Sequence, residues 1–154
     1  MNTNERLHVL YVDDNRDSFE MLKVMLDMSQ IEVAPARSMF EALTHASSER
    51  FDLYLLDSGL PDGDGVSLCR TLRAAHPEIP VLFYSGNANP EEIKMGMAAG
   101  ADAYITKPYS EGLAATILQL VTNYRERRVM FTDFRTLEAP AWSHAAQASS
   151  MGRL

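Results

Sequence analysis

Residues 52–65 read DLYLLDSGLPDGDG, an apolar run that ends at Asp57 and is followed by glycines and a proline. A short apolar run bounded by turn residues is typical of a buried strand in a parallel sheet. Glycine and proline break regular structure, so the segment after Asp57 is expected to be a loop. A helix is predicted next, over 66–75. The stretch therefore predicts a strand over 52–56, an acidic strand end, a loop and a helix.

The same alternation of strand and helix continues on both sides of this stretch. Four further strands are predicted at 8–12, 31–36, 81–84 and 103–106. Four further helices are predicted at 17–28, after Ser38, from Pro90 to residue 98 or 99, and from about residue 110 to 125. Five strands that alternate with five helices across short connections are typical of a parallel sheet covered by helices on both faces.

Local signals add detail to two of these helices. Ser38 can cap the helix that follows it, and Glu41, three residues later, would complete a capping box. Met21, Met25 and Met28 recur at helical spacing in the first helix, and they are expected to face the core.

Composition limits the class of protein. The chain has 154 residues, of which 46% are hydrophobic, and this is enough for one domain with its own core. Its net charge of −7 argues against broad binding to DNA, which depends on Lys and Arg. Cys69 is the only cysteine, which favours a reducing compartment. No apolar run resembles a signal peptide or could cross a membrane. We therefore expect a soluble cytoplasmic protein with no membrane partner and no direct nucleic-acid partner.

Polar side chains gather where the predicted strands end. Ligands of an open parallel α/β sheet bind at the carboxyl ends of its strands, and the residues at these positions are Asp13, Asp14, Asp57, Ser85 and Lys107. Clustered carboxylates repel one another unless a cation intervenes, and Mg²⁺ is the ion that combines a few carboxylates with phosphate oxygens. Hydroxyl and ammonium groups are the donors that phosphoryl oxygens need. The pattern predicts transfer of phosphate onto a carboxylate nucleophile.

Over residues 6–125 the sequence resembles the receiver domain of response regulators in two-component signalling, of the chemotaxis-receiver type. The resemblance is carried by the acidic pair in LYVDDN, the aspartate in LYLLDSGLPDGDG, the serine in VLFYSGN, and the aromatic residue and lysine in AYITKPY. It implies an α/β, doubly wound, flavodoxin-like fold with strand order 2-1-3-4-5. It also implies a single-domain response regulator, phosphorylated on Asp57 by a sensor histidine kinase or phosphotransfer protein and acting on a downstream protein target.

The resemblance implies a role for each residue of the site. Asp57 would be the phosphoacceptor. Mg²⁺ would be held by Asp14 directly, by Asp13 through water, by Asp57, and by the backbone carbonyl of Gly59. Lys107 would pair with Asp57 or its phosphate.

Further positions would control the response. Ser85 would bind a phosphoryl oxygen in the active state, and Tyr104 would be the switch aromatic that packs inward when Ser85 moves. The bond before Pro108 is commonly cis in this family. Gly59 and Asn87 occupy the positions whose side chains, in this family, influence the lifetime of the phosphoryl group. The output face would comprise the helix from Pro90, the strand over 103–106 and the last helix.

Two other classes of function predict different sequence features. A phosphorylation-independent adaptor would be expected to lack at least one of Asp14, Asp57 or Lys107, and all three are present. An aspartyl phosphatase needs a cap insertion, for which the short connections leave no room. The only catalysis expected is self-catalysed phosphoryl transfer and slow autodephosphorylation. A phosphate sink and a homodimer both stay open.

The sequence divides into a receiver domain over 1–125 and an extension over 126–154. In the extension, Phe131, Phe134 and Leu137 are three residues apart, and Trp142 lies beyond Pro140. The extension could continue the last helix and fold back on the domain. It could also be a docking or dimerisation peptide, because aromatic clusters anchor interfaces, or a disordered tail.

Overall fold

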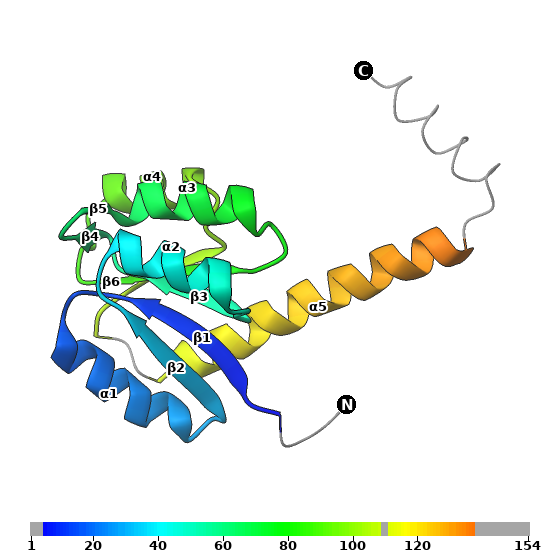
Figure 1. Ribbon diagram of the computed structural model, residues 1–154, viewed down its shortest axis with the longest axis horizontal. Coiled ribbons are helices and arrows are strands. Elements are labelled where there is room, and N and C mark those ends of the chain that lie inside the picture. The colour runs from blue at the N-terminus through cyan, green and yellow to red at the C-terminus, as the bar shows by residue number, and fades with distance from the viewer. Residues whose placement is uncertain (1–4, 109–110, 138–154) are drawn as a thin grey trace.

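The computed structural model describes residues 5–108 and 111–137, with side chains as far as residue 127. Five parallel strands form one sheet in the order β2-β1-β3-β6-β7 (Figure 1). These strands are β1 (Leu7–Val12), β2 (Ile31–Ala36), β3 (Leu53–Leu56), β6 (Val81–Ser85) and β7 (Ala103–Thr106). The helices are α1 (Arg16–Asp27), α2 (Met39–Ser48), α3 (Gly65–Ala75), α4 (Pro90–Ala98) and α5 (Leu113–Leu137). The predicted doubly wound sheet, with its five strands and five helices, is confirmed.

The sheet is buried on both faces because successive side chains of a strand point to opposite sides. In β3, Leu53 and Leu55 join a core with α1 and α5, whereas Tyr54 and Leu56 join a second core with α2 and α3. Figure 1 shows the same layers, with α1 and α5 on one side of the sheet and α2, α3 and α4 on the other. Burial on both sides explains the uninterrupted apolar runs of the strands.

The segment after Asp57 is more ordered than the predicted loop. It contains a two-stranded antiparallel hairpin of β4 (Gly59–Leu60) and β5 (Gly63–Asp64). With two residues in each strand, the hairpin is too short for a periodic pattern to appear in the sequence. It leads directly into α3, whose N-cap is Asp64.

The prediction that the methionines of the first helix face the core is wrong for two of the three. Met21 is 70% exposed and Met28 is 84% exposed, while Met25 is half-buried. Leu22 and Leu26, four residues apart, occupy the buried stripe of α1. Met21 is rotated about 100° from Leu22 around the helix, so it cannot share that stripe.

The capping box predicted at α2 is only half formed. The Ser38 side chain caps the helix and accepts a hydrogen bond from the Glu41 amide at 3.1 Å. The Glu41 carboxylate, however, accepts from the amide of Arg37 and not from that of Ser38. The amides of Met39 and Phe40 donate to Asp62 in the turn of the β4–β5 hairpin, at 2.8 and 3.0 Å.

Helix α5 is longer than predicted: it begins at Leu113 and ends at Leu137, not near residue 125. No glycine or proline interrupts residues 113–137, so no local signal ends the helix earlier. Its first half packs on the sheet, and its second half projects beyond the body of the molecule (Figure 1). The side chains of 128–137 and all of 138–154 lie outside the described residues, so the three readings of the extension and the division at residue 125 stay predictions.

In the described part of the chain, no helix is both long and apolar enough to span a bilayer.

Candidate functional site

Three carboxylates meet at the carboxyl edge of the sheet. Asp13 and Asp14 follow β1, and Asp57 follows the neighbouring strand β3. One carboxylate oxygen from each lies within 4.8 Å of the others. Asp13 is only 4% exposed, whereas Asp14 is exposed and Asp57 is half-buried. The predicted acidic cluster is therefore formed, with one member in the interior and one facing solvent.

Asp13 is held by three hydrogen-bond donors. Its Oδ2 accepts from the Tyr11 hydroxyl at 2.6 Å and from Lys107 Nζ at 2.5 Å, and its Oδ1 accepts from the Asn15 amide at 2.9 Å. Burial alone would raise the pKa of Asp13, but these donors outweigh it and hold the pKa below its usual value. Asp13 is therefore a fixed negative charge.

Lys107 bridges two members of the cluster from the end of β7. Its Nζ lies 2.5 Å from Asp13 and 3.8 Å from Asp57, so it contacts Asp13 more closely than the predicted partner. It also lies over the rings of Tyr11 and Tyr84, at 5.9 and 5.7 Å from their centroids. The bond between Lys107 and Pro108 is cis, as the resemblance implied.

Asp57 is in a different electrostatic position from Asp13. Burial raises its pKa, Lys107 opposes this rise, and the nearby Asp13 charge adds to it. The amide of Ser58 donates to Asp57 Oδ1 at 2.8 Å, and this contact anchors one carboxylate oxygen. Asp57 combines partial access with a raised pKa, which distinguishes it from Asp13 and makes it the candidate nucleophile.

Ser85 stands at the end of β6 and is 1% exposed. Its Oγ accepts from the Asn87 amide at 3.1 Å and lies 2.6 Å from the Oγ of Ser58. Sequence reasoning missed Ser58. The available signal was a second hydroxyl directly after the acidic strand end, but nothing local indicated that it would meet Ser85.

Gly59 lies at the exposed rim of the site, in β4. A Cβ added there would meet no atom within 4 Å. Gly65 is the opposite case, because a Cβ there would lie 2.1 Å from the backbone oxygen of Asp57. The first glycine therefore leaves open space beside the phosphoacceptor candidate, and the second allows α3 to start close behind it.

Tyr104 and Asn87 are connected to each other but stand apart from the carboxylates. Tyr104 is half-buried and stacks on Phe83 with ring centroids 5.3 Å apart, and its hydroxyl donates to the Asn87 carbonyl at 2.9 Å. The Asn87 side chain accepts from the Asn89 amide. Because Asn87 also bonds Ser85 through its amide, a main-chain path joins the Ser85 hydroxyl to the Tyr104 ring.

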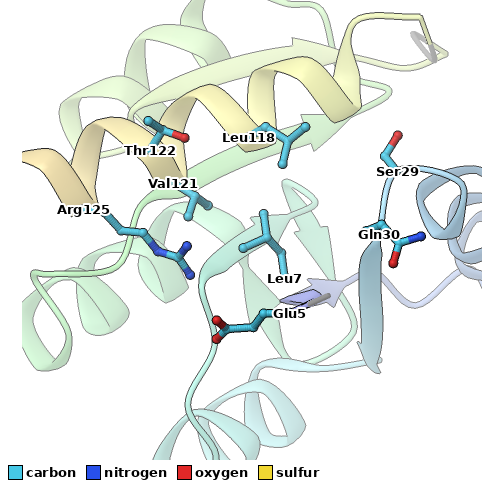
Figure 2. Close-up of a pocket in the computed structure, with 8 residues that line it drawn as sticks. All are labelled: Glu5, Leu7, Ser29, Gln30, Leu118, Val121, Thr122 and Arg125. Atoms are coloured by element: carbon cyan, nitrogen blue, oxygen red, sulfur yellow. The ribbon is translucent and has the colours of Figure 1, made fainter. Parts of the chain in front are cut away.

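One hollow lies beside α1 and another lies beside α5. One, of about 280 Å³, adjoins the carboxylates and is lined by Met21, Met25, Tyr84, Lys107 and Pro108 among others. The other, of about 170 Å³, lies where β1 begins, at the opposite end of the sheet, between Leu7 and α5 (Figure 2). None of the predicted site residues lines the second hollow.

Comparisons with known proteins agree with this geometry. The sequence profile of the response regulator receiver domain matches residues 9–119. The response regulator protein PilR of Pseudomonas aeruginosa is 34% identical over 119 residues, which are 75% of this chain and 27% of PilR. The transcriptional regulatory protein PrrA of Mycobacterium tuberculosis is 40% identical over 101 residues, which are 66% of this chain and 43% of PrrA. The chain thus spans less than half the length of either relative.

Solved structures give the same result. A CheY-like receiver domain protein from Methanospirillum hungatei superposes with a TM-score of 0.75 at 29% identity, covering 80% of this chain and 99% of that one. The chemotaxis response regulator CheY4 of Vibrio cholerae superposes with a TM-score of 0.67 at 29% identity, covering 75% and 98%. With the family profile, the sheet order and the acidic strand ends in agreement, this chain belongs to the response regulator receiver domain family.

Proposed function

We propose that the chain is a Mg²⁺-dependent switch that accepts a phosphoryl group on Asp57. The observation that carries the proposal is the meeting of three carboxylates within 4.8 Å of one another, with Lys107 bridging Asp13 and Asp57. A nucleophile, a buried anion and a cation at one strand edge are the parts that phosphoryl transfer to a carboxylate requires.

The reaction needs few groups from the protein. One carboxylate oxygen of Asp57 forms a bond to the phosphorus of a phosphohistidine, on a sensor histidine kinase or a phosphotransfer protein. The bond from phosphorus to the imidazole nitrogen breaks, and its electron pair stays on the nitrogen. Attack by water later breaks the acyl phosphate, releases inorganic phosphate and restores the carboxylate. Catalysis is therefore confined to self-catalysed transfer and slow hydrolysis.

The acidic cluster fits a magnesium ion. Three carboxylate oxygens this close repel one another, which favours a bound cation, and hard oxygen ligands suit Mg²⁺. Asp13, Asp14, Asp57 and the Gly59 carbonyl would hold it, and when bound it would neutralise charge on the phosphoryl oxygens.

Lys107 and Ser85 would give the switch its two states. Phosphate shifts a conformational equilibrium only if one state binds it better. An ammonium and a hydroxyl that reorient towards phosphoryl oxygens supply this preference. From Ser85, the main-chain contact through Asn87 to Tyr104 leads to the face of α4, β7 and α5, where a downstream protein would bind.

The buried free thiol of Cys69 suits the reducing cytoplasm in which this proposal places the chain.

The test is intact-mass spectrometry after incubation with acetyl phosphate and Mg²⁺. We expect wild type to gain one phosphoryl mass, and Asp57→Asn or added EDTA to abolish the gain. Asp17→Asn is the matched control, because Asp17 is an exposed carboxylate in the first turn of α1, outside the acidic cluster. If wild type gains no mass, phosphorylation by a small donor fails and the phosphorylation-independent adaptor becomes the better account. If Asp57→Asn gains as much mass as wild type, another residue accepts the phosphoryl group and Asp57 is not the acceptor.

A phosphate sink would pass this test and needs a second one. A switch must show phosphate-dependent changes in the amide spectrum of α4, β7 and α5, whereas a sink is expected to show changes only beside Asp57. NMR spectra of the Mg²⁺-bound protein with and without acetyl phosphate distinguish the two.

A further inference from the structure

Two hydroxyls form a pair beside Asp57. The Oγ atoms of Ser58 and Ser85 are 2.6 Å apart, which is a hydrogen bond in which either can donate. Ser85 is almost completely buried, and Ser58 is half-buried. Ser58 is also fixed on both sides by its backbone, because its amide donates to Asp57 and its carbonyl accepts from Gly65 at 2.8 Å. The position of the Ser58 side chain is therefore set by the same contacts that position Asp57.

The hydrogen-bonding capacity of Ser85 decides where its proton goes. A serine hydroxyl has one proton to donate and two lone pairs that accept. The Asn87 amide can only donate, so it occupies one lone pair of Ser85. If Ser58 donates to the other, both acceptor positions are filled and the Ser85 proton must point to a third group. Asp57 is adjacent to this pair, because its Oδ1 accepts from the amide of Ser58 at 2.8 Å, and a Ser85 hydroxyl directed at the Asp57 carboxylate would lower the pKa of Asp57.

We propose that Ser58 is a positioning residue, which directs the Ser85 hydroxyl proton towards Asp57 and the phosphoryl group that Asp57 accepts. The inference rests on the proposed function and deepens it. Ser58 would not touch the phosphoryl group. It would act through Ser85: by donating to a lone pair of Ser85, it would exclude the orientation in which the Ser85 proton points away from Asp57.

The consequence for phosphorylation follows from the charge that develops on the transferred group. While an Asp57 oxygen bonds to phosphorus and acetate leaves acetyl phosphate with the electron pair of the broken bond, charge is spread over the phosphoryl oxygens. A hydroxyl already directed at these oxygens stabilises the transition state without reorganisation. The Ser85 proton stays on Ser85 throughout. Without Ser58, Ser85 would have to be turned during the reaction.

The experiment is a double-mutant cycle on the initial rate of phosphorylation by acetyl phosphate and Mg²⁺, followed by intact mass. The four proteins are wild type, Ser58→Ala, Ser85→Ala and the double variant. Ser58→Thr keeps the hydroxyl and tests for rescue. Ser67→Ala is the matched control, because its hydroxyl bonds Asp64 at 3.2 Å, outside the cluster. Thermal melting of every variant confirms that it is folded.

We expect Ser58→Ala to slow phosphorylation roughly three- to tenfold, the range of one hydrogen bond. In the Ser85→Ala background the same change should alter the rate by less than about twofold, because a residue that acts only through Ser85 has nothing left to direct. Ser58→Thr should recover most of the wild-type rate, and Ser67→Ala should keep it.

Three results would overturn the inference. If Ser58→Ala slows phosphorylation equally in the wild-type and the Ser85→Ala backgrounds, the effect is a general structural one. If Ser58→Ala does not slow phosphorylation in the wild-type background, Ser58 has no influence on the reaction. Ser58→Thr as slow as Ser58→Ala would show that the hydroxyl is not what matters. All three leave the proposed function standing, because wild type is still phosphorylated. If wild type itself takes up no phosphoryl group, the proposed function fails and this inference fails with it.

Discussion

Tyr11 and Tyr54 lie on the adjacent strands β1 and β3, and both are almost completely buried, but their hydroxyls have opposite surroundings. The Tyr11 hydroxyl donates to Asp13 at 2.6 Å. The Tyr54 hydroxyl has no hydrogen-bond partner among the described residues, and burial raises its pKa to about 12. A buried polar group without a partner costs stability, whereas a hydrogen bond to a buried charge adds to it.

The same substitution should therefore have opposite effects at these two positions. Tyr54→Phe removes an unpaired hydroxyl and should raise the free energy of unfolding by up to about 1 kcal/mol. Tyr11→Phe removes a donor from Asp13 and should lower it by about 1–3 kcal/mol. Urea denaturation of the three proteins measures both changes. If Tyr54→Phe costs as much as Tyr11→Phe, the Tyr54 hydroxyl is hydrogen-bonded in solution.

Gly59 and Gly65 make a second pair at the residue scale. Since a Cβ at Gly59 meets nothing, Gly59→Met should fold normally and shield Asp57 from water. The phosphoryl half-life should rise several-fold, which corresponds to about 1 kcal/mol in the barrier to hydrolysis. Gly65→Ala, by contrast, clashes with the Asp57 backbone and should be destabilised. Decay of the phosphorylated mass after removal of acetyl phosphate measures the half-life, and an unchanged half-life would exclude a shielding role for position 59.

At the scale of elements, the β4–β5 hairpin is joined to the start of α2 by one side chain. The Asp62 carboxylate accepts from the amides of Met39 and Phe40, the first two of the helix. These two hydrogen bonds lower the pKa of Asp62, and a carboxylate is favoured at a helix N-terminus. The hairpin that follows the phosphoacceptor candidate is thereby tied to the α2 layer.

This contact should weaken in acid. Because the Asp62 pKa is lower in the folded protein, its contribution is complete above the unfolded value of about 3.9 and is lost as pH falls through the folded pKa. The Met39 and Phe40 amide signals should therefore move in NMR spectra at a midpoint below that value. In Asp62→Asn this titration should disappear. If both amides titrate equally in the variant, another carboxylate controls them.

At the scale of the molecule, α5 is attached to the body by a polar network at the amino end of the sheet. The Tyr124 hydroxyl donates to Asp102 at 2.7 Å, and Arg73 donates to Asp102 at 2.7 Å and to Tyr124 at 3.1 Å. Arg125 pairs with Asp52 at 3.1 Å. The attachment of the helix to the body therefore extends at least as far as Tyr124 and Arg125.

A chain ending at residue 127 should consequently fold like the full chain. We expect its free energy of unfolding to change by less than about 0.5 kcal/mol and its phosphorylation to be unchanged. A chain ending at residue 120 loses buried Val121 together with the Tyr124 network, and it should lose about 3 kcal/mol or more. Urea denaturation of the two truncated chains makes the comparison. A large loss for the chain ending at 127 would instead favour the reading in which the extension packs back on the domain.

Much of the fold and of the candidate site was predictable from sequence. Short apolar runs, helical spacing and turn residues are local properties, and they predicted the alternation of strands and helices. The strands predicted at 31–36 and 103–106 have the same bounds as β2 and β7. The meeting of Asp13, Asp14, Asp57, Ser85 and Lys107 followed from one general fact, that parallel strands end at the same edge of their sheet. For these residues, position along the chain was enough to predict proximity.

Only the tertiary structure decided which of these side chains bind one another. It brought Ser58 to Ser85, Asp62 to the start of α2, and Lys107 closer to Asp13 than to Asp57. It also turned Met21 to solvent. Each of these outcomes depends on the distance or rotation between two packed elements. The sequence by itself determined the order of the elements and the chemistry at their ends, because both are local. The hydrogen-bond and ion-pair partners of these side chains depend on the tertiary structure, because packing sets the distances between elements that are far apart in the chain.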